Sequence, residues 1–332
     1  MTNKFPACPA ESFKFTEIRY AKGDWIARVT INRPEVYNAY TTCTIQELTA
    51  AFKDAMWDDR IAVIVLTGMG EKAFCTGGDV KEYAEVFTQR PRDYWKWMGA
   101  FIECHDLLRN CGKPTIARIN GIVAGGGNEF NMSCDLAVMS ERATIRQVGT
   151  RVGSVAAGGA TQWLPIMIGD RRAREMLLTC EPIDARTALD WGLVNRVVPQ
   201  ELLDDAVNEL AAKLIDKFPE CTRYTKTQVN FWKDMAWSQT IRHAQDWLSL
   251  HFATTEPYEG MKAFVEKRQP DYRAMREKAV DGAPEFLFGP YAQTCPSCGI
   301  QGLPAEFHFC GQCGAGLNPS PLPDDKRAKR ND

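Results

Sequence analysis

The chain has 332 residues, of which 45% are apolar and 25% are charged, a composition typical of an ordinary globular protein. This length, about twice that of a usual domain, predicts one large domain and one small one. The net charge of −2 argues against a nucleic-acid partner. No apolar run approaches the ~18 residues of a membrane span, and the N-terminus lacks an apolar signal segment, so we expect no membrane contact and a cytoplasmic location.

The hydrophobic pattern predicts alternating strands and helices in the first half of the chain and mostly helices in the second. Residues 14–32 are typical of a β-hairpin that turns at 21–24. Thr44 and Glu47 form a capping-box pattern, which predicts a helix that begins there. Further strands are expected at 61–66, 115–119, 136–139 and 193–198, and helices at 92–110, 171–178, 184–191, 200–215, 222–234, 240–253 and 257–267. The order indicates an α/β fold with a helical C-terminal part at about 200–280.

A glycine-rich segment at 120–135 carries the strongest sign of chemistry. A predicted strand leads into three consecutive glycines, 125–127, and a helix follows them. Glycine allows a sharp turn and exposes backbone N–H groups, and the first turn of a helix favours negative charge. The segment has neither the Gly-x-Gly-x-x-Gly pattern of dinucleotide loops nor the Gly-Lys-Ser/Thr of phosphate loops. It is suited to an oxygen that becomes anionic during a reaction, with simple helix packing as the alternative.

A second glycine loop at 72–80 also follows a predicted buried strand, so two loops can supply the two N–H donors that an enolate oxygen needs. In four stretches, the sequence resembles the crotonase (enoyl-CoA hydratase/isomerase) superfamily: 73–79, 120–129, 153–161 and 259–268. The resemblance covers roughly residues 14–273. It implies a crotonase ββα spiral core in an acyl-CoA domain at 1–280, whose helical C-terminal part supports trimerisation.

The resemblance also implies the residues of an active site on an acyl-CoA thioester, in which CoA is part of the substrate. The oxyanion-hole N–H groups fall on Gly78 and Gly126, and the catalytic glutamate falls on Glu129. The alternative for Glu129 is a solvated glutamate at a helix N-terminus. The substrate contacts are expected from Arg33, Ala39, Gly77, Asp79, Val80, Ser154, Thr161, Phe264 and Lys267. Because the last two usually reach over from a neighbouring subunit, we expect a homo-oligomer, either a trimer or a dimer of trimers.

The chain departs from the hydratases of this superfamily at Gly149, where they carry a second glutamate, so the two-glutamate arrangement for adding water is missing. Ala156 and Phe252 replace an aspartate and a tyrosine of the ring-closing dihydroxynaphthoyl-CoA synthases. The sequence most resembles the alicyclic ring hydrolases of the 6-oxocyclohex-1-ene-1-carbonyl-CoA hydrolase type, although it lacks their insertion after 193–198 and has Gln162 in place of an acid.

These features predict water-dependent ring opening of a cyclic β-oxoacyl-CoA, as in the degradation of aromatic or alicyclic acids. Hydration or isomerisation of an enoyl-CoA is the alternative within the enzyme class. A catalytically inactive scaffold that binds a partner is the alternative of another class. Aromatic residues that could wall an acyl pocket, or belong to an ordinary core or subunit interface, are Tyr83, Phe87, Tyr94, Trp95, Trp97 and Phe101.

The C-terminal cysteines form two C-x-x-C pairs with eleven residues between them: Cys295 with Cys298, and Cys310 with Cys313. Four thiolates match the tetrahedral preference of Zn²⁺, and a redox dithiol needs only one such pair. We therefore predict a structural zinc ribbon at 295–316, after a linker at 281–294 and before a disordered tail at 317–332. His308 is a competing ligand. The other eight cysteines are expected to be free and mostly buried.

Overall fold

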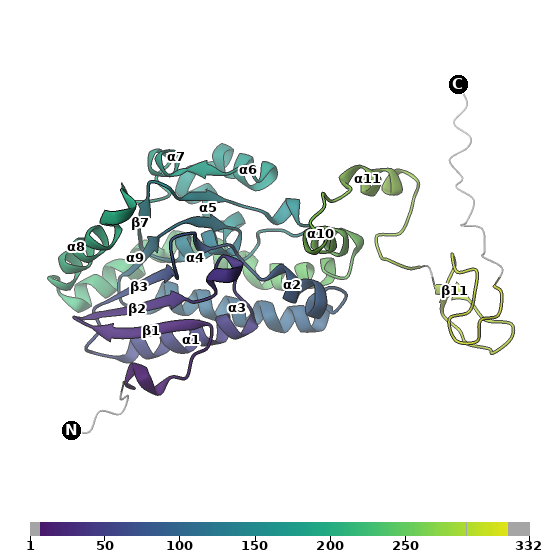
Figure 1. Cartoon of the computed structure of the whole chain (residues 1–332), viewed down its shortest axis with the longest axis horizontal. Coiled ribbons are helices and arrows are strands. Elements are labelled where there is room, and N and C mark those ends of the chain that lie inside the picture. Colours follow the sequence, from purple (N-terminus) through teal and green to yellow (C-terminus); the bar gives the residue numbers. More distant parts are fainter. Residues whose placement is uncertain (1–6, 290, 318–332) are drawn as a thin grey trace.

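In the computed structural model of the chain, which describes residues 7–289 and 291–317, helices pack around two β-sheets, and a third sheet of two short strands lies near the C-terminal end (Figure 1). The larger sheet has the strand order β1-β2-β3-β5-β7-β10. Only its β1–β2 pair is antiparallel. Its strands are β1 (Ile18–Gly23), β2 (Ile26–Ile31), β3 (Val63–Gly68), β5 (Thr115–Ile119), β7 (Leu136–Ser140) and β10 (Arg196–Val198). The smaller sheet consists of β4 (Ala73–Cys75), β6 (Ile122–Ala124), β8 (Thr144–Arg146) and β9 (Ile183–Asp184).

Both faces of the central strand β3 are buried, since its alternate side chains point to opposite sides of the sheet and each side is covered. On one face, Val63 and Val65 contact the helix α8 (Leu203–Ile215). On the other face, Ile64 and Leu66 belong to the main core, which includes residues of α1 (Thr42–Trp57) and α3 (Pro91–Asn110). The near-continuous apolar pattern of β3 follows from this two-sided burial.

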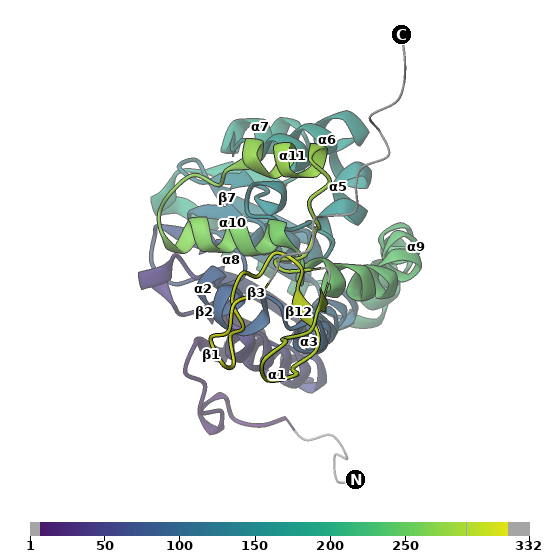
Figure 2. The ribbon, with the colours of Figure 1, turned by 90° about the vertical axis from the view of Figure 1, so that its right-hand side faces the viewer.

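The remaining long helices lie between residues 126 and 280 of the chain. They are α4 (Gly126–Ser133), α5 (Ala160–Ile168), α6 (Asp170–Thr179), α7 (Ala185–Asp190), α9 (Pro219–His251), α10 (Thr255–Val265) and α11 (Tyr272–Val280). Figure 2 shows α10 and α11 across one end of the body, with α9 to the side. Beyond them lie β11 (Tyr291–Gln293) and β12 (Leu303–Pro304), which belong to the cysteine-bearing segment (Figure 1).

Short helical turns complete the chain. They are η1 (Ala10–Ser12), η2 (Pro34–Val36), α2 (Val80–Glu82), η3 (Tyr83–Phe87), η4 (Gly149–Arg151) and η5 (Gln200–Leu202), of which η3 is a π-helical turn. The predicted class, α/β with a helical C-terminal region, is confirmed. No helix within the described residues is long and apolar enough to cross a membrane. The tail predicted at 317–332 lies, except for Leu317, outside the described residues.

The predicted cap of α1 was wrong by one turn. Thr41 is the N-cap: its hydroxyl oxygen accepts from the N–H of Thr44 at 3.2 Å, and the Thr44 hydroxyl oxygen accepts from the N–H of Thr41 at 2.9 Å. Glu47, expected to close the box, instead accepts from the backbone N–H groups of 16–18 at 2.7–3.0 Å. These three donors lie at the start of an edge strand, where they need an acceptor from outside the sheet.

Two further boundaries differ from prediction. The hairpin is confirmed, but it turns at Asp24 and Trp25, which both have positive φ, as a two-residue hairpin turn with the right twist requires. The two helices expected at 222–234 and 240–253 form the single helix α9. No glycine or proline interrupts it, and Trp237 near its middle is buried and donates to Asp106 of α3 at 2.7 Å.

Candidate active site

The two glycine loops lie side by side because β4 and β6, which lead into them, are parallel neighbours. A Cβ atom built on Gly77 would lie 3.2 Å from the backbone nitrogen of Gly126. Gly77 has a φ of 94°, and a Cβ on Gly127 would lie 2.0 Å from the carbonyl oxygen of Cys75, so this close approach requires glycine on both sides. Within the described residues, the N–H groups of Gly78 and Gly126 donate to no backbone carbonyl. Both are therefore available to a ligand oxygen.

Glu129 lies in the first turn of α4 and is 5% exposed, so the interpretation of a solvated glutamate was wrong. Its Oε1 accepts from the N–H of Ala160 at 3.3 Å, and the carboxylate also accepts from the N–H of Gly158. Burial raises the pKa of Glu129 to about 7, although the two N–H groups oppose this shift. A carboxyl group with this pKa can both accept and donate a proton near neutral pH.

Glu129 borders a group of rings, all buried except the partly buried Tyr83, which we name the aromatic cluster: Tyr40, Tyr83, Phe87, Tyr94, Trp97, Phe101, Phe130 and Phe252. A Cβ built on Gly158 would meet the Phe101 ring at 2.5 Å and Glu129 Oε2 at 3.0 Å, which places the carboxylate against the cluster. Trp95, predicted with this group, lies elsewhere: it is 47% exposed and donates to Asp246 at 2.9 Å. The cluster provides the low-dielectric surroundings that raise the pKa of Glu129.

Backbone occupies the space that a second acid would need. A Cβ built on Gly149 would lie 3.0 Å from the nitrogen of Ala156 and 3.1 Å from the carbonyl oxygen of Ser154. The N–H of Ser154 donates to the carbonyl of Gly149 at 2.9 Å, which holds the loop in this position. Thr161, also expected near substrate, donates to Gln162, whose side chain accepts from the N–H of Gly159 at the start of α5.

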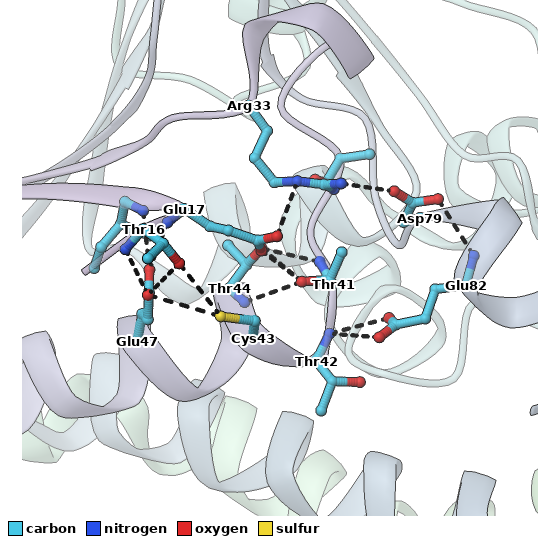
Figure 3. Close-up of polar contacts among 12 residues, drawn as sticks. Thr16, Glu17, Arg33, Thr41, Thr42, Cys43, Thr44, Glu47, Asp79 and Glu82 are labelled. Atoms are coloured by element: carbon cyan, nitrogen blue, oxygen red, sulfur yellow. Dashed lines mark hydrogen bonds and ion pairs between the residues drawn. The ribbon is translucent and has the colours of Figure 1, made fainter. Parts of the chain in front are cut away.

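Arg33 and Asp79, both expected at the substrate, form an ion pair with each other at 3.0 Å (Figure 3). Arg33 also donates to the carbonyl of Ala39 at 2.5 Å and lies 3.4 Å from the Glu17 carboxylate. Asp79 caps α2, which begins at Val80, by accepting from the N–H groups of 81 and 82. This network ties the segment at 33–39 to the loop that carries Gly78.

Phe264 and Lys267 lie at the end of α10, a helix that packs on α2 and η3. The Phe264 ring is 59% exposed. The contact with a neighbouring subunit's substrate that we expect for these residues stays a prediction.

Sequence reasoning missed Tyr40, and it treated Tyr83 only as one ring of an aromatic run. A Cβ on Gly126 would lie 1.9 Å from the Tyr40 hydroxyl oxygen, and a Cβ on Gly78 would lie 2.0 Å from that of Tyr83. Each hydroxyl therefore touches one of the two glycines. The available signal was the position of Tyr40 at the end of the segment expected to contact CoA.

The four C-terminal cysteines converge, with their sulfur atoms within 4.8 Å of one another. The two pairs form matching turns: the N–H of Gly299 donates to the carbonyl of Cys295, and that of Gly314 donates to Cys310. Leu303 and Leu317 pack with the two buried cysteines, Cys295 and Cys310, as a small core. Four sulfur ligands at this separation fit a tetrahedral metal ion. His308 is not one of the gathered ligands.

The remaining eight cysteines are free, as predicted, and five of them are buried: Cys75, Cys104, Cys111, Cys134 and Cys180.

Comparison with known proteins agrees with this geometry. Residues 21–276 match the sequence profile of the family described as enoyl-CoA hydratase/isomerase. An enoyl-CoA hydratase subunit of Geobacillus kaustophilus HTA426 is 33% identical, and the match covers 79% of this chain and 99% of that chain with a TM-score of 0.62. DspI of Pseudomonas aeruginosa is 31% identical over 80% of this chain and 100% of its own, with a TM-score of 0.64.

An enoyl-CoA hydratase/isomerase of Mycobacterium paratuberculosis shares the fold, with a TM-score of 0.71 at 24% identity over 75% of this chain and 99% of its own. The family match spans most of the sequence and includes both glycine loops and Glu129. The chain therefore belongs to the enoyl-CoA hydratase/isomerase family, as an acyl-CoA enzyme with the crotonase fold.

Proposed function

We propose that this enzyme opens the ring of a cyclic β-oxoacyl-CoA with water, and that Gly78, Gly126 and Glu129 perform the chemistry. The observation that carries the proposal is the buried carboxyl group of Glu129, with a pKa of about 7, beside two loops with free N–H groups. The absence of a second acid at Gly149 disfavours simple addition of water to a double bond. The aromatic cluster suits a flat or cyclic acyl group.

The reaction follows from these positions. Water adds to the ring ketone while the Glu129 carboxylate takes one of its protons. The tetrahedral adduct collapses, the bond between the ketone carbon and the α carbon breaks, and its electron pair moves into the thioester as an enolate. The N–H groups of Gly78 and Gly126 hold the enolate oxygen. The Glu129 carboxyl then returns its proton to the α carbon, which yields an open-chain CoA thioester with a new carboxylic acid.

Isomerisation or hydration of an enoyl-CoA is the second candidate, because the relatives that share 30% identity or more include named enoyl-CoA hydratases. Isomerisation needs only one group that accepts and returns a proton, which Glu129 supplies. An inactive scaffold is disfavoured. Burying a carboxyl group without a charged partner destabilises the fold, and a binding module would gain no function in return.

Mass spectrometry of the products from a panel of cyclic and linear acyl-CoAs tests the proposal. A β-oxo ring substrate should gain the mass of one water and lose its ring, and in ¹⁸O-water the label should enter the new carboxyl group. Water addition to enoyl-CoAs without ring opening would establish the second candidate instead.

We also propose that the enzyme is a homo-oligomer, either a trimer or a dimer of trimers. Exposed apolar side chains on α9 support this, because several large apolar side chains on one helix favour an interaction surface. These side chains are Tyr224, Val229, Phe231, Trp232, Met235 and Leu250. Light scattering that gives the mass of an active monomer would contradict it.

We propose further that Cys295, Cys298, Cys310 and Cys313 hold one structural Zn²⁺ ion in a zinc ribbon at 295–316. Four thiolates close the coordination shell, so the ion would organise the segment and take no part in catalysis. The free thiols elsewhere in the chain are consistent with a cytoplasmic protein.

A further inference from the structure

We propose that Tyr40 and Tyr83 form a second oxyanion site, in which the Tyr40 hydroxyl donates a hydrogen bond to an oxygen on the β carbon of the acyl group and Tyr83 positions Tyr40. This inference rests on the proposed function, since it assigns the polar partner of the ring ketone in the same site. It also specifies the substrate class: an acyl group with a β-oxygen rather than a plain hydrocarbon.

The two hydroxyl groups lie at the two glycines that hold the thioester oxygen in the proposed reaction. A Cβ on Gly126 would lie 1.9 Å from the Tyr40 hydroxyl oxygen, and a Cβ on Gly78 would lie 2.0 Å from that of Tyr83. In a β-oxoacyl thioester, only the α carbon separates the thioester carbonyl from the ketone carbonyl. A donor that touches the glycines is therefore within reach of the second oxygen when the first is bound between them.

In the proposed pair, the Tyr40 hydroxyl keeps one proton for a ligand. Each hydroxyl influences the pKa of the other; in this proposal Tyr83 serves as the donor to Tyr40, so that the proton of Tyr40 is donated onward. Burial raises the pKa of both hydroxyls well above the usual value, and the nearby Glu129 carboxylate raises them further. Both groups are therefore protonated donors near neutral pH. A donor that itself accepts a hydrogen bond is polarised and becomes stronger.

Backbone contacts hold Tyr40 in this position. Its N–H donates to the carbonyl of Gly77 at 2.9 Å, and its carbonyl accepts from the N–H of Asp79 at 2.8 Å. The Tyr40 ring packs edge-on against Phe130 at 5.6 Å between centroids. These backbone hydrogen bonds attach Tyr40 to the loop that presents Gly78.

Tyr83 is the first residue of the π-helical turn η3. Such turns are rare in proteins, and those that occur often lie at functional sites. The N–H of Thr88 donates to the carbonyl of Tyr83 at 2.9 Å, and the N–H of Tyr83 donates to Asp79 at 3.0 Å. The ring contacts Trp97 edge-on at 5.0 Å. Trp97 Nε1 is buried and has no acceptor among the described residues, so the aromatic cluster holds a further unused donor.

The other side of the site offers no replacement for the missing acid, since backbone surrounds Gly149. When water adds to the ring ketone, the ketone oxygen takes up negative charge. The Tyr40 hydroxyl stabilises this charge by a hydrogen bond and keeps its proton. Glu129 still takes the proton of water and returns it to the α carbon. The pair therefore accounts for C–C cleavage in a site with one carboxyl group.

The test compares two reactions in the full-length protein. One is ring opening of 2-oxocyclohexane-1-carboxyl-CoA, and the other is exchange of the α proton for deuterium in cyclohexane-1-carboxyl-CoA, which lacks the β-oxygen. Tyr40→Phe should lower kcat for ring opening by ~100-fold relative to the exchange rate, the usual effect of removing one oxyanion donor. Tyr83→Phe should lower the same ratio by about 10-fold, with KM unchanged.

Tyr20→Phe is the matched control, because it removes a tyrosine hydroxyl on the edge strand β1 that donates to Asp54 at 2.6 Å, whereas the glycine loops follow β4 and β6 of the smaller sheet. It should not alter the ratio. Equal loss of both reactions in Tyr40→Phe, or no loss in either, overturns the inference. If Glu129→Gln abolishes both reactions while Tyr40→Phe is unaffected, only the inference fails. If Glu129→Gln retains both, the proposed function fails first.

Discussion

The Oε1 atom of Glu129 accepts a hydrogen bond from the N–H of Ala160 at 3.3 Å, which joins the first turn of α4 to the first turn of α5. Two helix N-termini therefore converge on one carboxyl group. The N–H groups of Gly158 and Ala160, at the start of α5, favour the carboxylate, but burial outweighs them and raises the pKa of Glu129 to about 7. The hydrogen bonds hold the carboxyl group in one orientation, and its pKa lets it gain or lose a proton near neutral pH.

Replacing Glu129 by glutamine should lower kcat by at least ~100-fold, the usual scale for a general acid/base, and leave binding of the CoA thioester within a few-fold. The amide keeps the size of the side chain but cannot carry the proton. Steady-state kinetics and a binding titration measure the two quantities. Glu175→Gln on the exposed surface of α6 is the control. Turnover that survives in Glu129→Gln would remove Glu129 from the chemistry.

The same substitution should change how stability depends on pH. Folding raises the pKa of Glu129 from 4.5 to about 7, so the folded state binds this proton more tightly than the unfolded state. The contribution of Glu129 to the stability of the wild-type chain should therefore fall as pH rises from about 4.5 through 7, by roughly 3 kcal/mol in total. Glutamine carries no such proton. Urea unfolding at pH 5 and pH 8.5 should show Glu129→Gln gaining on wild type at the higher pH, and parallel curves would refute the burial argument.

Introducing the second acid should not create a hydratase. In Gly149→Glu the new side chain meets the backbone of 154–156 at 3.0–3.3 Å from its Cβ, so we expect a loss of about 1–3 kcal/mol in unfolding free energy from overpacking. Gly23→Glu is the control, because no atom lies within 4 Å of a Cβ there. Thermal unfolding and an enoyl-CoA hydration assay measure the outcome. A stable variant that hydrates enoyl-CoA would show that the backbone of 154–156 can move to make room for the glutamate.

Removing zinc should affect the C-terminal segment alone. We expect one Zn²⁺ per chain by elemental analysis, and chelation should unfold residues near 293–316, because so short a segment cannot fold on its own core. The glycine loops belong to the main core, so kcat should survive, both after chelation and in a truncation after Lys278. Hydrogen exchange and kinetics check this. A truncated protein that is folded and oligomeric but inactive would show that the ribbon contributes to catalysis.

Much of this architecture follows from local pattern. The strand at 115–119 and the helix at 92–110 were predicted nearly to the residue, because each is long or strongly periodic and is ended by glycine or polar residues. The strands β4, β6 and β8 have only three residues each, too few for a period of two to show. They form a sheet with the two-residue strand β9, so pairing between distant short segments, rather than a local pattern, defines them.

The candidate site divides in the same way. Glycine loops and the acid after them are contiguous motifs, so the resemblance to the crotonase superfamily could assign Gly78, Gly126 and Glu129 as candidates from the sequence. Tyr40 could not, because its proposed role depends on where the fold places its hydroxyl, at Gly126. The pairing of Arg33 with Asp79 was also hidden, since 46 residues separate them along the chain.

The central claim is that this acyl-CoA enzyme opens a ring by adding water across a carbon–carbon bond. Incubation of wild-type enzyme with 2-oxocyclohexane-1-carboxyl-CoA in ¹⁸O-water, followed by mass spectrometry, tests it most directly. We predict an open-chain dicarboxylic CoA thioester that carries one ¹⁸O atom in its free carboxyl group, and no such product with Glu129→Gln. Unchanged substrate, together with hydration or isomerisation of enoyl-CoAs by the same preparation, would contradict the claim.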